Sequence, residues 1–246
     1  MGQALLRAAR ERDDADIVAA LVRNGSPWSG QRVDDAGLVY SVALNASPQV
    51  LVDFSNADAF DDTLRLAVER RSAFVSGTTG IDARQRASME RAAVTIPVLW
   101  SANFSLGVAL LTRLVAQAAQ AFPQWDCEIV EAHHGAKRDA PSGTALALGR
   151  TVAQAREVDF DAVARRSRDD ESRPRAAGEI GFAAIRAGDI VGEHEVMFAT
   201  RGERIELVHR ATDRIIFARG ALEAARWSAG KPAGLYVLDD VFGQAR

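Results

Sequence analysis

Short apolar runs alternate with segments of helical spacing through the first hundred residues, and this alternation constrains the fold more than any other feature of the sequence. Strands are expected at 50–54, 73–76 and 96–100, and helices at 61–71 and 83–93. Parallel strands need long crossover connections, which are usually helices. The pattern therefore predicts an α/β fold in which helices cover both faces of a doubly wound parallel sheet.

The beginning of the chain departs from this pattern, because it starts with a helix. Residues 3–12 have helical spacing, and the apolar run at 17–22 is typical of a buried strand. Residues 23–36 contain clustered asparagine, glycine, serine and proline, which predict a loop. A doubly wound nucleotide-binding domain normally begins with a strand that lies centrally in its sheet. We therefore expect this sheet to lack its first strand.

The second half of the chain predicts a different kind of domain. Helices are expected at 105–122, 142–157 and 214–227, and strands at 127–132, 180–186, 191–200, 204–210 and 235–241. Residues 203–208 alternate between polar and apolar, as does an antiparallel strand with one face in water. We predict an α+β domain with a mixed or antiparallel sheet at 103–215, while residues 1–102 and 216–246 form the parallel-sheet domain.

Composition narrows the classes of function. Hydrophobic residues make up 48% and charged residues 26% of the chain, and its net charge of −3 argues against nucleic-acid binding. No apolar stretch approaches the length of about 18 residues that a membrane span needs, and the N-terminus lacks the features of a secretion signal. Cys127 is the only cysteine, which fits the reducing cytoplasm. The charged stretch 164–175 predicts a solvated loop or lid, with phosphate binding as the alternative.

The densest polar cluster lies at 131–144, where a predicted strand leads through a loop into a helix. His133 and His134 are adjacent at the strand end, and Lys137 and Arg138 follow in the loop. Ser142-Gly143-Thr144 then opens the helix, where a serine caps well and a glycine lets a ligand approach the backbone. The free N–H groups of such a helical turn bind anions, and a nearby histidine can donate a proton near neutral pH.

Less specific explanations exist for each part of this cluster. Adjacent side chains on an extended strand point to opposite faces, so His133 and His134 are poorly placed to share a metal ion, and no metal is expected. Either histidine could be a structural hydrogen-bonding residue. Ser142 to Thr144 could be no more than a helix cap.

The segment EAHHGAKRDAPSGTA at 131–145 resembles the signature of the dihydrodipicolinate reductase family, also called 4-hydroxy-tetrahydrodipicolinate reductases. The resemblance covers essentially the whole chain. It extends to DFS at 53–55, GTTG at 77–80, SANFSLGV at 101–108, IGFAAIRAGDIVGEHEVMFA at 180–199, ELVHRATDR at 206–214, FARGALEAARW at 217–227 and GLYVLDDV at 234–241.

This resemblance implies reduction of 4-hydroxy-tetrahydrodipicolinate with NADPH or NADH, on a Rossmann-like domain joined to a substrate-binding domain that builds a homotetramer. His133 would be the proton donor and Lys137 its catalytic partner. The two carboxylates of the cyclic substrate would be held by His134, Lys137, Ser142, Gly143, Thr144 and Arg214. The cofactor would contact Gly2, Arg23, Phe54, Gly77, Thr78, Thr79, Ser101, Ala102, Asn103 and Phe104. The alternative is a degenerate, non-catalytic relative that binds a dicarboxylate.

The sequence departs from the family at the glycine-rich turn that cradles the cofactor pyrophosphate. The family pattern is roughly V-x-G-x-x-G-R-M-G, and only its final Met-Gly is present, with Gly2 as the last glycine. Either the start has been assigned too late or the chain is a true variant. In both cases we expect this 246-residue chain to bind the cofactor weakly.

Cofactor choice depends on the end of the second expected strand, where an acidic residue commonly binds the ribose 2′-hydroxyl. Val22 occupies that place here, and Arg23 follows it. A guanidinium pairs well with a phosphate, so the sequence favours NADPH over NADH. The alternative is that Arg23 is an ordinary surface residue of the loop.

Overall fold

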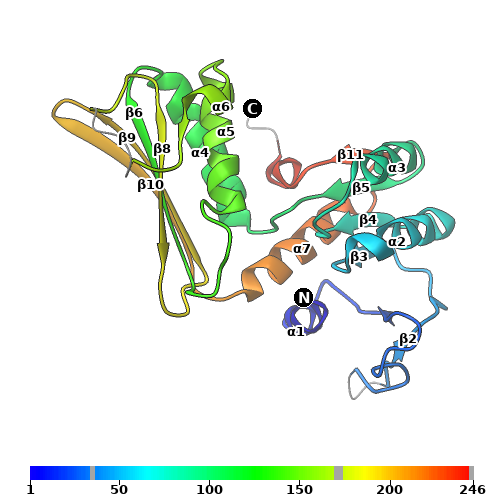
Figure 1. The fold of residues 1–246 in the computed structure, drawn as a ribbon. Coiled ribbons are helices and arrows are strands. Elements are labelled where there is room, and N and C mark those ends of the chain that lie inside the picture. The colour runs from blue at the N-terminus through cyan, green and yellow to red at the C-terminus, as the bar shows by residue number, and fades with distance from the viewer. Residues whose placement is uncertain (34–36, 169–173, 244–246) are drawn as a thin grey trace. The chain divides into compact units, whose positions relative to one another are not determined.

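The chain folds into two units, residues 1–104 with 217–246 and residues 105–216 (Figure 1). The computed structural model describes residues 1–33, 37–168 and 174–243. The first unit carries a parallel sheet flanked by helices and the second a mixed sheet, so the predicted α/β class is confirmed. None of the described helices is long and apolar enough to cross a membrane.

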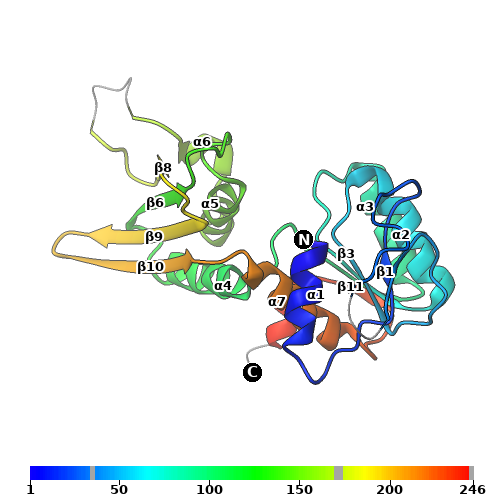
Figure 2. The same ribbon diagram turned by 90° about the horizontal axis from the view of Figure 1, so that it is seen from below.

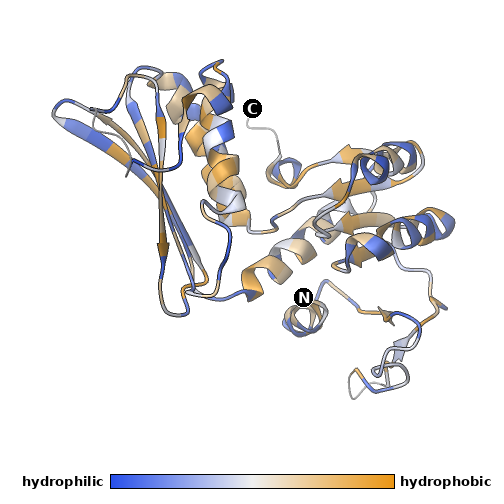
Figure 3. Cartoon of the chain, viewed as in Figure 1, coloured by the Kyte–Doolittle hydropathy of each residue, from blue (hydrophilic) through white to orange (hydrophobic). Residues whose placement is uncertain are grey.

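A four-stranded parallel sheet forms the centre of the first unit. Its order is β11–β5–β4–β3, with bounds Gly234–Tyr236, Pro97–Trp100, Ala73–Ser76 and Val50–Asp53. These strands are mostly hydrophobic because helices pack against them (Figure 3). The crossover helices are α2 (Ala57–Arg70) and α3 (Ala83–Ala93), and both begin at a side-chain cap, Asn56 and Asp82 respectively.

The predicted buried strand at 17–22 is wrong in extent and burial. Only β1 (Ala20–Leu21) forms, and it pairs with β2 (Tyr40–Ser41), which was not predicted, in a separate two-stranded sheet. Among the described residues, β3 pairs with β4 alone, so its other edge carries no strand. A run of apolar residues becomes a buried strand only when neighbours pair with its edges, and none does so here at residues 17–19.

The two ends of the first unit meet through helices. Helix α1 (Gly2–Arg10) matches the predicted helix at 3–12, and it lies beside α7 (Ile215–Ser228) (Figures 1 and 2). Just after α1, Arg12 pairs with Glu223 of α7 at 2.6 Å. The strand predicted at 235–241 stops at Tyr236, and Leu238–Phe242 form a 3-10 helix, because the Asp240 carboxylate accepts the N–H of Val237 and turns the chain.

A five-stranded mixed sheet forms the second unit, in the order β10–β9–β6–β8–β7. The bounds are Glu203–Ala211, Gly192–Thr200, Asp126–His133, Ile180–Arg186 and Ala164–Arg165. The central strand β6 runs parallel to β8 and antiparallel to β9. Helices α4 (Leu106–Ala121) and α5 (Gly143–Ala155) cover one face, where they bury a core that includes Ile129 and Val196. No helix of the described residues lies on the opposite face (Figure 1).

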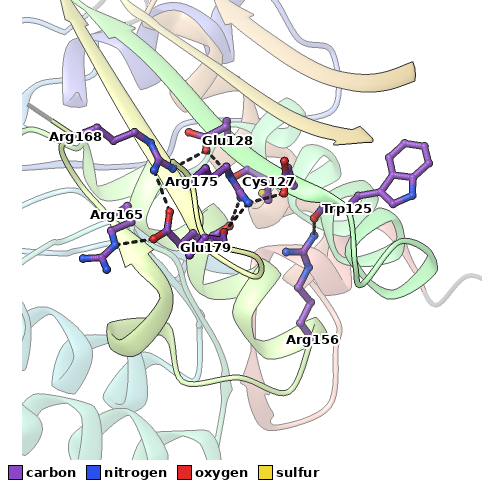
Figure 4. A network of polar contacts seen from close by, with 10 residues as sticks. Trp125, Cys127, Glu128, Arg156, Arg165, Arg168, Arg175 and Glu179 are labelled. Carbon is purple, nitrogen blue, oxygen red and sulfur yellow. Dashed lines mark hydrogen bonds and ion pairs between the residues drawn. The ribbon is translucent and has the colours of Figure 1, made fainter. Parts of the chain in front are cut away.

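Two short elements, α6 (Phe160–Val163) and β7 (Ala164–Arg165), were not predicted. Helix α6 ends just before the charged stretch 164–175, and β7 forms the first two residues of that stretch. Residues 169–173 of that stretch lie outside the described part of the chain. The described arginines are engaged by carboxylates rather than freely solvated (Figure 4). Arg165 and Arg168 both pair with Glu179, at 3.0 and 2.9 Å, and Arg168 and Arg175 share Glu128. This pairing leaves little support for the phosphate-binding alternative.

Glu179 is the buried member of this network, with 5% of its surface exposed. Replacing it by glutamine removes the charge that compensates the two arginines, so Glu179→Gln should lower the free energy of unfolding by about 1–3 kcal/mol. Urea denaturation followed by circular dichroism measures this, with the exposed Glu69→Gln as the control expected to change stability by less than about 0.5 kcal/mol. Equal effects of the two substitutions would contradict a stabilising role of the network.

Candidate active site

The polar cluster at 131–144 begins inside the sheet. Glu131 and His133 lie two residues apart on β6, and this spacing places both side chains on the same face of the strand. The loop that follows leads to Ser142, whose hydroxyl accepts the N–H of Ala145 and caps α5. The carboxyl end of β6 and the amino end of α5 therefore meet at one place.

Glu131 is 1% exposed and accepts hydrogen bonds from three segments. His133 Nδ1 lies 2.6 Å from Oε2, and the Ser142 N–H lies 3.0 Å from Oε1. Arg186 on β8 completes the set with a two-pronged contact at 2.8 and 2.7 Å. Burial acts to raise the pKa of Glu131, but the hydrogen bonds from Arg186, His133 and Ser142 outweigh it and hold the pKa below its ordinary value. The carboxylate is therefore ionised.

His194 belongs to the same cluster and comes from β9, which pairs with β6 on the side opposite to β8. Its ring lies 5.2 Å from that of His133 at 75° between planes, and its Nε2 is 3.2 Å from the Ser142 hydroxyl. Burial, with a smaller contribution from His133, lowers the pKa of His194 to about 4. His194 is therefore uncharged near neutral pH, and it contributes a hydrogen-bonding group rather than a cation.

The remaining residues expected at the substrate surround the same loop. Arg214 donates to His134 Nε2 at 3.2 Å, although the two residues are 80 positions apart in the chain. Lys137 pairs with Asp139 at 2.9 Å, and hydrogen bonding to Lys137 lowers the pKa of that carboxyl group. Gly143 and Thr144 form the first turn of α5. Cationic groups and a helix N-terminus are thus gathered in the second unit, as an anion site requires.

In the first unit, most residues expected at the cofactor lie at the carboxyl ends of β3, β4 and β5. The buried Asp53 accepts the hydroxyls of Ser76 and Thr78, at 2.8 and 2.7 Å, and so ties the end of β3 to the loop after β4. The Trp100 indole N–H donates to the Thr78 carbonyl at 2.9 Å, which ties that loop to β5. Ligands of open α/β sheets bind at such strand ends.

Of the other residues expected at the cofactor, most lie in the loops after β3, β4 and β5 or at the start of α1, while Arg23 lies after β1. The rings of Phe54 and Phe104 lie 5.3 Å apart, and a Cβ at Gly77 would lie 2.2 Å from the Phe54 ring, which would then have to shift. Thr79 and Ser101–Asn103 occupy the same loops. Gly2 begins α1, where no side chain caps the helix. Arg23, by contrast, is exposed in the loop after β1, which belongs to the separate two-stranded sheet.

Comparison with known proteins identifies the family. The family model "Dihydrodipicolinate reductase, N-terminus" matches residues 1–104, and "Dihydrodipicolinate reductase, C-terminus" matches residues 107–242. The chain belongs to the dihydrodipicolinate reductase family. The 4-hydroxy-tetrahydrodipicolinate reductase of Stenotrophomonas maltophilia is 49% identical over 98% of this chain and 92% of that protein. That of Ruegeria pomeroyi is 46% identical over 99% of this chain and 94% of that protein.

A solved structure shares the fold of this family member. The dipicolinate-bound dihydrodipicolinate reductase from Paenisporosarcina sp. TG-14 matches with a TM-score of 0.81 and 20% identity, over 99% of this chain and 95% of that chain. A second match, GenD2 from gentamicin A biosynthesis in complex with NAD, has a TM-score of 0.54 and 11% identity, over 98% and 87%. At these identities both matches show a shared fold.

Three residues of the cluster carry no role in the sequence analysis, namely Glu131, Arg186 and His194. Glu131 stands in the recognised signature, and its spacing of two residues from His133 is a signal that could have identified it. Arg186 and His194 are distant in sequence and reach the site only through strand pairing, because β8 and β9 flank β6 on its two sides. Both lie in the segment 180–199 that resembles the family, but that resemblance assigned no role to either residue.

The lowered pKa of His194 predicts a specific pH dependence of stability. Between about pH 6.5, its ordinary pKa, and about pH 4, the unfolded chain binds a proton that the folded chain does not, so stability falls as the pH is lowered. His194→Gln should lower stability at pH 7 but flatten its pH dependence between pH 6.5 and 4, by up to about 3 kcal/mol. Urea denaturation at several pH values measures this. An unchanged slope would show that His194 is not held neutral.

Proposed function

We propose that the chain catalyses the NAD(P)H-dependent reduction of 4-hydroxy-tetrahydrodipicolinate to tetrahydrodipicolinate, in diaminopimelate and lysine biosynthesis. The observation that carries the proposal is the cluster at the end of β6, where a proton-donating histidine, a helix N-terminus and cationic side chains lie together in a member of this reductase family. A protein that only bound a dicarboxylate would need the cations but no histidine held on a buried carboxylate.

The substrate class follows from the charges of the second unit. A cyclic dicarboxylate needs two anion-binding places, and this unit offers the first turn of α5 at Ser142–Thr144 together with Lys137, and the His134–Arg214 pair. The structural relative from Paenisporosarcina binds dipicolinate, a planar dicarboxylate of the same ring size, which supports this assignment.

The chemistry can be assigned to named atoms. The product has one oxygen fewer than the substrate, so the net reaction adds one hydride and one proton and releases the hydroxyl group as water. The bound nicotinamide cofactor supplies the hydride. His133 donates the proton from Nε2, since its Nδ1–H is engaged by Glu131, and Lys137 assists it.

The cofactor fits the loops after β3, β4 and β5, with Phe54, Gly77–Thr79 and Ser101–Phe104 on the nicotinamide and ribose side and the uncapped start of α1 at Gly2 facing the phosphates. Arg23 would select NADPH through its 2′-phosphate. We further propose a homotetramer, because the face of the second sheet on which no described helix lies carries apolar residues such as Val208 and Ile185, which are 40% and 48% exposed. We also propose a cytoplasmic location, which fits the single cysteine, Cys127.

His133→Gln tests the proposed activity. Oxidation of the cofactor is followed by its absorbance, with enzymatically generated 4-hydroxy-tetrahydrodipicolinate as substrate. The substitution should lower kcat by about 10²- to 10⁴-fold, because general acid catalysis is lost, while KM changes little. No oxidation of the cofactor by the wild-type chain would favour the non-catalytic relative.

Arg23→Ala tests cofactor choice. If the guanidinium contacts the 2′-phosphate, the substitution should raise the KM for NADPH by about tenfold and leave the KM for NADH nearly unchanged. The neighbouring Arg32→Ala, on an exposed part of the same two-stranded region, is the control and should alter neither. A preference for NADPH over NADH that is unchanged by Arg23→Ala would mean that Arg23 is an ordinary loop residue.

A further inference from the structure

We propose that Glu131, held in place by Arg186, is the positioning residue of the site, and that it fixes the orientation of His133 and restricts proton exchange to Nε2. The inference rests on the proposed function, since it assigns a cause to the reactivity of the proposed proton donor. It concerns a residue that would not touch the substrate, because Glu131 is 1% exposed and lies behind His133 on the same strand.

Hydrogen bonds to both oxygens hold the Glu131 carboxylate in one position. Its two oxygens receive four contacts, two from Arg186, one from His133 and one from the Ser142 N–H. Arg186 is in turn anchored by donating to the carbonyl of Asp139 at 2.6 Å. One carboxylate therefore sets the relative positions of the proton donor, the loop after β6 and the cap of α5.

The same contact decides which nitrogen of His133 exchanges protons. An ionised carboxylate can only accept, so the hydrogen between Glu131 and His133 belongs to Nδ1. The neutral ring then carries its lone pair on Nε2, and the charged ring has its transferable proton there. The ring is packed on two sides. Its centroid lies 5.2 Å from that of His194, at 75° between the ring planes, and its Nε2 is so close to Gly192 that a Cβ at that position would lie 3.1 Å away.

A structural ion pair would account for the Glu131–Arg186 contact alone, but not for the other two bonds. A guanidinium in two-pronged contact already compensates a buried carboxylate. Placing His133 Nδ1 at 2.6 Å and the Ser142 N–H at 3.0 Å from the same group serves the orientation of those two residues. Carboxylates that orient histidines in this way occur in many catalytic sites.

Glu131→Gln tests the inference through kinetics and through the histidine itself. We expect kcat to fall by about 10²-fold, with KM within threefold, because the amide oxygen introduced can still accept the Ser142 N–H. In the double variant with His133→Gln, kcat should be no lower than with His133→Gln alone, because an orienting residue acts only through the group it orients. Nitrogen-15 NMR above the titration range of the ring should show His133 protonated at Nδ1 in the wild type and as a mixture of tautomers in Glu131→Gln.

Glu128→Gln is the matched control, because Glu128 also lies on β6 and pairs with arginines but contacts no histidine. It should leave kcat and the His133 tautomer unchanged. If Glu131→Gln does not fold, the pair Glu131→Gln with Arg186→Met removes both charges of the ion pair and should show the same loss of kcat and the same mixed tautomers.

Three results would overturn the inference. The first is a kcat of Glu131→Gln within twofold of the wild-type kcat. The second is that adding Glu131→Gln to His133→Gln lowers kcat as much as Glu131→Gln does alone. The third is a loss of kcat in Glu128→Gln equal to that in Glu131→Gln. If the wild type itself does not turn over, the proposed function fails. The NMR comparison then still decides whether Glu131 fixes the His133 tautomer, so the two failures are distinguishable.

Discussion

The buried carboxylate of Glu131 is the interaction on which the second unit's site depends. An ionised group taken out of water destabilises a protein unless each of its oxygens is satisfied, so the groups around it must converge. Here they come from β6, from β8 and from the cap of α5. The contacts that compensate the charge of Glu131 therefore join the end of β6 to the start of α5. The polar loop between them is held at both of its ends.

Asp53 has a comparable place in the first unit. It too is a buried carboxylate at the end of a strand, and it accepts the hydroxyls of Ser76 and Thr78 and the N–H of Ser55. The compensation differs in kind, because Asp53 is satisfied by hydroxyls and an amide rather than by a guanidinium. Because these donors are neutral, ordering this loop uses no cationic side chain. Cationic side chains therefore stay free to pair with the phosphates of a cofactor bound at the strand ends.

The sequence predicted the fold where local periodicity decides it, and failed where strand neighbours decide it. The helices at 83–93 and 142–157 were placed within two residues of their observed bounds, because helical spacing and a capping residue such as Ser142 are local signals. The helix predicted at 61–71 misses the first turn of α2, which begins at Ala57. The run at 17–22 carries the same apolar signal as a core strand, yet it is largely irregular because its burial depends on partners that no local pattern specifies. Likewise the signature revealed His133, while Arg186, supplied by a neighbouring strand, could not be predicted.

The residues assigned to the substrate and those assigned to the cofactor lie in different units, so binding of the dicarboxylate and binding of the cofactor can be considered separately. Every residue assigned to the dicarboxylate and to proton donation lies within 105–216, while every residue assigned to the cofactor lies within 1–104. The first group lies beside a five-stranded sheet, whereas the second lies in the unit where, among the described residues, β3 pairs with β4 alone and β1 and β2 form a separate sheet. A weaker contact with the cofactor would therefore not weaken the binding of a dicarboxylate, since the hydrogen bonds that hold Glu131 and the cap of α5 come from residues of the second unit. Under the proposed function, binding of a dicarboxylate would therefore test the cluster of the second unit, and hydride transfer would test the first unit as well.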